Sequence, residues 1–336
     1  MGKLAKREIE TLELISLGYT NQEICDDLVI EMSTVKKYVQ HIFKKLRAKD
    51  REAAVRHALR QNVIDGLSSH VPNNLYHSLS KFIGRQQELQ QLDTLLLAPE
   101  SRLITLLGMG GIGKTRLALQ IAKGYALNHR LFRNGIFRIG LSTASTTTDL
   151  IQLIAKTIGL PIPESMIDEK ALAHRLCGYL FDKKMLLIFE NGERLVQANH
   201  LIQQILTTSP CIKIVATSQI KLDVYGEVIL QLNGLSVSDQ SQVDNLNAIS
   251  PATELFIQAA QQHVCLPPSE QDYPTVGKIC QQIQGHPLAI ELAAAQLDAL
   301  SLEQILSKLS NPLDLLSCTQ LGRAARHQSM RAACAY

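Results

Sequence analysis

The chain has 336 residues, of which 46% are apolar and 19% are charged, and its formal net charge is +3. This length suits two or three domains with buried cores, and the sequence has no run of 18 apolar residues that would predict a membrane span. It also opens without a secretory signal. The seven cysteines are scattered and never spaced C-x-x-C, which favours reduced thiols in a cytoplasm over disulfides or a metal site.

Positive charge is concentrated near the N-terminus. Nine basic and only two acidic residues lie between Ser33 and Arg60, so the remainder of the chain is net acidic. A basic segment on a nearly neutral chain predicts a polyanionic partner for that segment.

The first sixty residues predict short amphipathic helices. One covers residues 7–16, and a capping box formed by Thr20 and Glu23 starts the next. After the turn VIEM a third helix begins near Ser33, and a fourth covers about 51–61. Apolar residues line one face of the third helix: Val35, Val39, Ile42 and Leu46. Its opposite face carries basic and polar residues, Lys37, Gln40, His41 and Lys44, with Lys36 at its flank. This pattern is typical of a helix-turn-helix that reads the DNA major groove, and a solvated lysine face on a helical bundle is the alternative.

Residues 4–60 resemble the LuxR-type helix-turn-helix domain of bacterial transcription regulators. The positions that carry the resemblance are Leu4, Arg7, Glu8, Leu12, Gly18, Asn21, Glu23, Ile24, Leu28, Ile30, Thr34, Val35, Lys36, Ile42, Lys45, Leu46, Arg51, Ala54 and Val55. The resemblance implies binding to double-stranded DNA. The residues it assigns to base edges are Lys36, Lys37 and Gln40, and those it assigns to phosphates are Thr34 and Lys45. Lys44 completes the predicted DNA-binding set, and residues 51–61 would form a dimer surface.

A phosphate-binding motif follows a predicted linker at 63–80, which is rich in Ser, Asn, Gly and Pro. An apolar strand at 102–107 leads into GMGGIGKT, and a helix continues through Ala126. A glycine-rich structural turn is the alternative, but a strand before and a helix after the motif favour a P-loop. The residues predicted to bind phosphates are Gly108, Met109, Gly110, Gly111, Ile112, Gly113, Lys114, Thr115 and Arg116. Backbone N–H groups would converge on phosphate oxygens while the lysine reaches the terminal phosphates.

Strands and helices alternate beyond the loop. Further strands are expected at 135–141, 185–190, 212–218 and 228–232, with helices near 147–158 and 170–181. This alternation predicts a mostly parallel sheet covered by helices. After Leu235 the pattern becomes all helical, with periodic runs at 252–264, 273–283, 287–298 and 302–309.

Residues 81–316 resemble the NB-ARC-type ATPase core of STAND regulators, which are signal-transducing switches related to AAA+ ATPases. The matching segments are FIGRQQEL (82–89), GMGGIGKT (108–115), LLIFENGERL (186–195), VATSQIKL (215–222) and GHPLAIELAA (285–294). The resemblance implies ATP or ADP as the ligand, together with Mg²⁺. The residues it lays along adenine are Phe82, Ile83, Gly84 and Arg85. It also closes Pro287 over the base or ribose, although a proline equally suits the first turn of a helix.

Hydrolysis is predicted to be slow or absent. The family's magnesium site implies Thr115 and Glu190 as ligands, but Glu190 stands where the family has Asp, and Mg²⁺ tolerates little geometric error. Asn191 follows where related proteins often place the catalytic base, and an amide cannot take a proton. Gln219 stands where an Arg is common, which removes a charge that could sense the terminal phosphate. Glu193 is the remaining candidate base, with a solvated helix-start acid as the alternative.

The sequence thus predicts a multidomain protein: an all-α helix-turn-helix domain, an α/β P-loop domain with a mostly parallel sheet, and an all-α helical subdomain. The expected segments are 1–62 for DNA binding, 63–80 as linker, 81–235 for the P-loop domain, 236–316 for the helical subdomain and 317–336 for the start of a winged-helix domain.

The leading hypothesis is a cytoplasmic, homo-oligomeric transcription regulator, assembled through residues 51–61 or by a nucleotide-dependent contact. The alternative is a STAND signalling or defence ATPase whose N-terminal helices bind protein.

Overall fold

The computed structural model describes residues 4–16, 19–60, 71–76, 80–127, 131–163, 168–237, 249–264 and 268–309. Two compact units divide the chain. The first comprises residues 1–72 with 125–133, and the second comprises the rest. Most of the predicted linker and all of the predicted winged-helix segment lie outside the described residues, as does Gly18.

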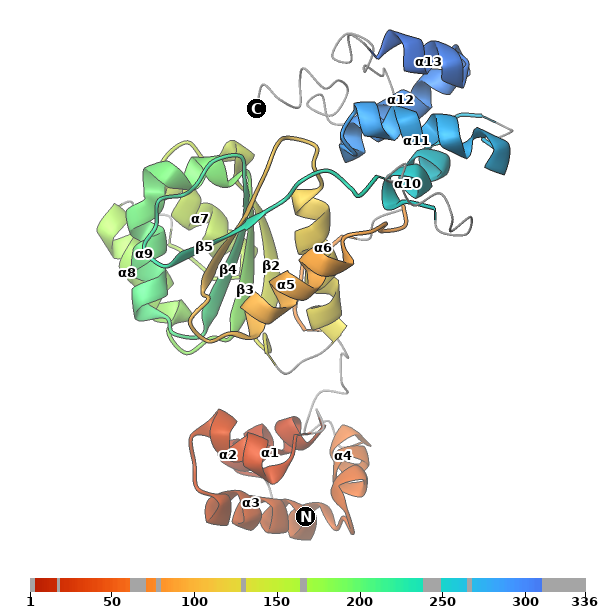
Figure 1. Cartoon of the computed structure of the whole chain (residues 1–336). Coiled ribbons are helices and arrows are strands. Elements are labelled where there is room, and N and C mark those ends of the chain that lie inside the picture. The colour runs from red at the N-terminus through yellow and green to blue at the C-terminus, as the bar shows by residue number, and fades with distance from the viewer. Residues whose placement is uncertain are drawn as a thin grey trace. The chain divides into compact units, whose positions relative to one another are not determined.

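The first unit is a small helical bundle (Figure 1). Its helices are α1 (Lys6–Ser16), α2 (Asn21–Leu28), α3 (Met32–Leu46) and α4 (Arg51–Arg60). The predicted capping box at the start of α2 is present, because the Thr20 side chain accepts a hydrogen bond from the Glu23 N–H and Glu23 accepts one from the Thr20 N–H. Apolar side chains from all four helices share one core, as expected for a helix-turn-helix domain.

The second unit is built on a five-stranded sheet of order β2-β3-β4-β1-β5 in which every pairing is parallel. The strands are β1 (Leu103–Leu107), β2 (Gly135–Gly140), β3 (Met185–Glu190), β4 (Ile212–Ser218) and β5 (Glu227–Gln231). Both Glu190 of β3 and Leu106 of β1 are in register with Thr217 of β4. The carboxyl ends of these three strands therefore lie together at one edge, where parallel α/β sheets bind ligands.

Helices cover both faces of the sheet, with α5 and α6 on one side and α7, α8 and α9 on the other (Figure 1). Their bounds are α5 Gln86–Leu97, α6 Lys114–Leu127, α7 Thr147–Thr157, α8 Glu169–Leu180 and α9 Asn199–Thr208. Helix α9 was not predicted from the sequence, and it follows a 3₁₀ segment at Gly192–Ala198. No side chain caps its N-terminus and its first turn has no acidic residue, so the usual start signals are missing.

A second hydrophobic core lies among the C-terminal helices α10 (Pro251–Ala260), α11 (Tyr273–Gln282), α12 (Pro287–Ala295) and α13 (Leu302–Lys308). The run predicted at 287–298 is helical only to Ala295 and ends in a 3₁₀ turn at Gln296–Asp298. The predicted architecture of a helical domain, a parallel α/β domain and a helical subdomain is confirmed. Within the described residues, no helix is long and apolar enough to cross a membrane.

Candidate nucleotide site and helix-turn-helix surface

The predicted phosphate loop connects the end of β1 to the start of α6. Gly111 and Gly113 adopt φ values of 75° and 99°, which only glycine reaches without strain. The Lys114 ammonium donates hydrogen bonds to the carbonyl oxygens of Gly108 (2.7 Å) and Met109 (2.8 Å). Thr115 is half-buried in the first turn of α6. Glycine turns ahead of a helix N-terminus form the backbone arrangement that binds phosphates.

Arg85 is buried, and its hydrogen bonds connect the phosphate loop to α5 and to the segment after β5. Its Nη2 donates to the carbonyl oxygens of Ile112 (2.9 Å) and Asn233 (2.6 Å), and its Nη1 pairs with Glu88 at 2.7 Å. These contacts give Arg85 a structural role at the loop, and its predicted contact with adenine stays a prediction.

The other predicted adenine contacts lie beside the helical subdomain. Ile83 is buried in the core of the C-terminal helices, and Phe82 is half-buried. Gly84 has a φ of 66°, and a Cβ atom there would lie 2.9 Å from Pro251. Arg116 donates to the carbonyl oxygen of Lys81 at 2.8 Å, so its guanidinium holds the start of this segment.

The start of α12 contacts the phosphate loop through its N-cap residue, His286, which was not predicted as a site residue from the sequence. The Nε2 atom of His286 lies 2.9 Å from the carbonyl oxygen of Gly110, and its Nδ1 accepts a hydrogen bond from the Ala289 N–H at 3.4 Å. Nε2 therefore carries the proton and donates it. Burial lowers the pKa of His286, as do the charges of Lys114 and Arg85.

Pro287 occupies the first helical position of α12, where its missing N–H costs nothing. This is the structural interpretation that the sequence left open. A contact between Pro287 and the base or ribose remains a prediction. The sequence did hold one signal for His286. It directly precedes a proline that starts a helix, which is the position of an N-cap residue.

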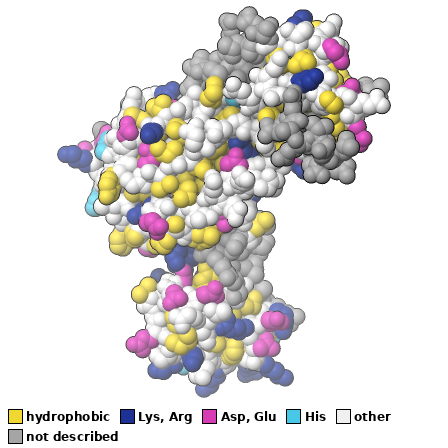
Figure 2. Space-filling model, in the orientation of Figure 1, with side chains coloured by type: hydrophobic (Ala, Val, Ile, Leu, Met, Phe, Trp, Pro, Cys, Tyr) yellow, Lys and Arg dark blue, Asp and Glu magenta, His cyan; other side chains and the backbone are white. Residues whose placement is uncertain are grey.

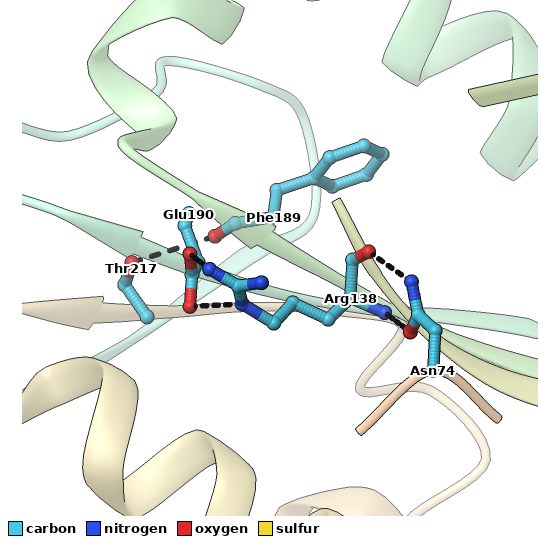
Figure 3. Close-up of polar contacts among 5 residues, drawn as sticks. All are labelled: Asn74, Arg138, Phe189, Glu190 and Thr217. Carbon is cyan, nitrogen blue, oxygen red and sulfur yellow. Dashed lines mark hydrogen bonds and ion pairs between the residues drawn. The ribbon is translucent and has the colours of Figure 1, made fainter. Parts of the chain in front are cut away.

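The predicted magnesium ligand Glu190 is bound by an arginine (Figure 3). Arg138 lies on the neighbouring strand β2, and its Nε and Nη2 donate to Oε1 at 2.7 Å and Oε2 at 2.6 Å. The hydrogen bond with Glu190 raises the pKa of Arg138. P-loop proteins of this kind typically bind nucleotide with Mg²⁺, but both oxygens of Glu190 already accept hydrogen bonds from a guanidinium, whose positive charge disfavours a second cation at the same carboxylate. Arg138 was not identified from the sequence.

The candidate base Glu193 is also engaged. Its Oε1 accepts a hydrogen bond from the backbone N–H of Gln219 at 2.6 Å, which joins the turn after β3 to the turn after β4. Asn191, between Glu190 and Glu193, has a φ of 61°. The carboxylate of Glu193 thus stabilises a loop, and its catalytic role stays a prediction.

The predicted DNA-reading face of α3 is on the surface. Lys36, Lys37, Gln40 and Lys44 are exposed and Thr34 is half-buried, while Val35, Ile42 and Leu46 face the core. Lys and Arg side chains gather on the first unit where α3 lies (Figure 2). The spacing of these residues puts them along one side of the helix, as a groove-reading helix requires.

Lys45 differs from the other lysines of α3, because it pairs with the buried Glu8 of α1. Its Nζ lies 2.7 Å from Glu8 Oε2, and His41 lies 3.5 Å from Oε1. Burial raises the pKa of Glu8, but hydrogen bonds from Lys45 and the Ala5 N–H, with the charges of Lys45 and His41, outweigh it and lower the pKa overall. Lys45 therefore stabilises the packing of α1 on α3, and its predicted contact with phosphate stays a prediction.

The fold and the loop define a P-loop protein with an N-terminal helix-turn-helix. Comparison with known families agrees: residues 2–58 match bacterial regulatory proteins of the luxR family, and residues 85–217 match the NB-ARC domain. The chain thus joins a LuxR-type helix-turn-helix domain to an NB-ARC P-loop domain. This fold implies nucleotide binding.

Relatives of known sequence share parts of this arrangement. A predicted HTH-type transcriptional regulator of Mycobacterium tuberculosis is 30% identical over 238 residues, which are 70% of this chain and 25% of the relative. An uncharacterised protein of the same organism is 32% identical over 250 residues, 74% of this chain and 58% of the relative. The response regulator VraR of Staphylococcus aureus is 46% identical over 61 residues, 18% of this chain and 29% of its own.

Among solved structures, Cdc6p from Pyrobaculum aerophilum has a TM-score of 0.46 at 18% identity, over 67% of this chain and 62% of its own. The chain spans a quarter to rather more than half of the length of the first two mycobacterial relatives.

Proposed function

We propose that this protein is a cytoplasmic, nucleotide-responsive transcription regulator. Its α3 helix reads duplex DNA, and its P-loop unit holds ADP or ATP with slow or absent hydrolysis. The observation that carries the proposal is the combination of an exposed basic face on α3 with a glycine-rich phosphate loop in the same chain. The mycobacterial relative named as an HTH-type regulator supports it. The regulator acts as a homo-oligomer, through α4 or through a nucleotide-dependent contact.

The contacts proposed for the nucleotide follow from the loop. The backbone N–H groups of residues 108–115 and the Lys114 ammonium hold the phosphates. Residues 82–85 and Pro287 flank the adenosine. Slow turnover follows from the engagement of both acidic candidates, because Glu190 is paired with Arg138 and Glu193 with the Gln219 N–H.

DNA binding is tested with the full chain by fluorescence anisotropy on selected and scrambled duplexes. Replacing both Lys37 and Gln40 with Ala should flatten sequence preference, since a good base contact is worth about 1–3 kcal/mol. Replacing Lys44 should weaken binding to all duplexes alike. It should also reduce the slope of log K against log salt concentration by about 1. Lys170→Ala, exposed on α8, is the control. A chain that binds no duplex even at low salt would favour the alternative, in which the N-terminal helices bind protein.

Nucleotide binding is tested by thermal unfolding of the nucleotide-stripped chain. A ligand held at 100 times its Kd should stabilise the protein by about 2.7 kcal/mol. Lys114→Ala should remove most of this gain because it deletes the ammonium at the phosphate loop, whereas Lys170→Ala should keep it. If neither ADP nor ATP shifts the melting temperature of the wild type, the nucleotide part of the proposal fails.

A further inference from the structure

We propose that Arg138 is the built-in counter-charge of Glu190, so that the site binds adenine nucleotides without using Glu190 as a magnesium ligand. The inference rests on the proposed nucleotide binding and specifies how the site balances its charge. A P-loop protein with a free acid at this position presents it to the metal. In this chain a neighbouring strand supplies the cation instead.

The pairing engages both oxygens of the Glu190 carboxylate (Figure 3). Arg138 Nε and Nη2 lie 2.7 Å and 2.6 Å from the two oxygens of Glu190, in the bidentate geometry that matches a guanidinium to a carboxylate. The Glu190 side chain is only 6% exposed and that of Arg138 is 34% exposed. A buried ion pair of this kind resists separation, because removal of one partner leaves an uncompensated charge.

Two residues of one short segment hold Arg138 in place. Asn74 Oδ1 accepts from the Arg138 N–H at 2.7 Å, and Asn74 Nδ2 donates to the Arg138 carbonyl at 2.8 Å (Figure 3). Asn73 forms a parallel bridge with Ile136 beside them. The Arg138 guanidinium also lies 4.9 Å from the centre of the Tyr76 ring, a cation–π contact. The arginine is therefore fixed at both its backbone and its head group.

The location of the pair is that of a metal-binding acid. Glu190 ends β3 in register with Thr217 of β4, which is itself in register with Leu106 of β1, one residue before the strand's end. With about 4.8 Å between neighbouring strands, Glu190 stands roughly 10 Å across the sheet from the strand that leads into the phosphate loop. Magnesium requires oxygen ligands at about 2.0–2.1 Å in near-octahedral geometry. A carboxylate held by Arg138 has only its remaining lone pairs to offer, beside a fixed positive charge that opposes a second cation, and turning it toward the metal would break two charge-assisted hydrogen bonds.

The test compares the binding of ADP and the non-hydrolysable analogue AMP-PNP, with Mg²⁺ or with EDTA, by titration calorimetry on the full chain. For the wild type and for Glu190→Gln, removing magnesium should change the Kd by less than about threefold. Arg138→Gln leaves a buried carboxylate without its counter-charge, so metal-free affinity should fall by about tenfold or more and Mg²⁺ should restore it. The double variant Arg138→Gln/Glu190→Gln should return to the magnesium-independent behaviour of the wild type.

A second readout follows the metal itself. Electron paramagnetic resonance of Mn²⁺ in the AMP-PNP complex should give the same spectrum for the wild type and Glu190→Gln, and an altered spectrum for Arg138→Gln. Arg138→Lys keeps the positive charge and serves if Arg138→Gln does not fold; it should remain magnesium-independent.

The possible results separate the two proposals. A wild type whose affinity depends on Mg²⁺ by tenfold or more, with that dependence abolished in Glu190→Gln, would overturn the role of Arg138 and leave nucleotide binding intact. A chain that binds neither nucleotide in either buffer would instead overturn the proposed function itself, and this inference with it.

Discussion

His286 and Gly110 join the helical subdomain directly to the phosphate loop: the imidazole Nε2 donates a hydrogen bond to the Gly110 carbonyl oxygen over 2.9 Å. The same imidazole caps α12 through its Nδ1 atom. Leu288, two residues further on, packs where a side chain on Gly111 would otherwise extend. The phosphate loop is therefore in direct contact with the start of α12.

The first prediction concerns this histidine. His286→Ala should destabilise the protein by about 1–3 kcal/mol, because it removes an N-cap and takes the imidazole donor away from the partly buried Gly110 carbonyl. Urea denaturation measures the change, and Gln281→Ala, exposed on α11, should have no comparable effect. A His286→Ala protein as stable as the control would show that this contact adds nothing to the docking of α12.

The pH dependence of stability gives a second test of the same residue. Burial holds the pKa of His286 below its usual value, so the folded state favours the neutral imidazole. The unfolded chain takes up the proton near pH 6.5. This contribution to stability is therefore complete above about pH 6.5 and is lost as the pH falls toward the lower pKa of the folded state. The stability difference between wild type and His286→Ala should shrink from pH 7.5 to pH 5.5. A difference that grows on acidification would contradict the lowered pKa and mean that the folded state favours the imidazolium.

The strands, the phosphate loop and the basic face of α3 were predictable from local patterns in the sequence. Apolar runs bounded by turn residues mark strands, and a capping box marks a helix start. The pairing of Arg138 with Glu190 was not predictable, because the two residues are 52 positions apart in the chain. They come into contact because β2 and β3 are neighbours in the sheet. His286 and Gly110 are farther apart still, at 176 positions. Contacts of this kind depend on tertiary arrangement, which periodicity does not encode.

A prediction for the helix-turn-helix domain concerns Lys45. Because this lysine is paired with buried Glu8, Lys45→Met should reduce stability and raise the pKa of Glu8, whose burial would then act without its main compensation. In the wild type the lowered pKa of Glu8 adds stability that is present above about pH 4.3 and is lost as the pH falls through the folded-state pKa. Carboxyl NMR titration measures the shift directly.

Lys44→Met, at an exposed position on the same helix, is the matched control and should leave the titration of Glu8 unchanged. Weaker DNA binding by Lys45→Met with an unaltered Glu8 pKa would mean that Lys45 acts on phosphate rather than on the fold.

Thiol reactivity should follow burial. Burial raises the pKa of Cys280 to about 12 and also raises that of Cys177, whereas Cys211 is exposed. Since the thiolate is the reactive form, iodoacetamide at pH 8 should label Cys211 rapidly and label Cys177 and Cys280 only after unfolding. Peptide mass spectrometry resolves each site, and Cys211→Ser should remove the label at that site while leaving Cys177 and Cys280 as slow as before. Rapid labelling of Cys280 in the folded protein would show that the core of the C-terminal helices opens readily.

The same substitution at two glycines should have opposite effects. Gly111 has a φ of 75°, and a Cβ atom there would lie 2.7 Å from Leu288 Cβ and 3.0 Å from His286 Cε1. Gly111→Ala therefore combines a strained backbone with a clash against α12. It should lower the free energy of unfolding by more than about 1 kcal/mol and reduce the thermal shift given by ADP.

Gly178 lies exposed within α8, where an added Cβ meets nothing within 4 Å. Gly178→Ala should stabilise the protein by about 0.5–1 kcal/mol, because alanine loses less backbone entropy in a helix. Urea denaturation of the two variants beside the wild type measures both signs. If Gly111→Ala were as stable as Gly178→Ala, α12 would not pack against the phosphate loop in solution, and the hydrogen bond between His286 and Gly110 would not hold the two together.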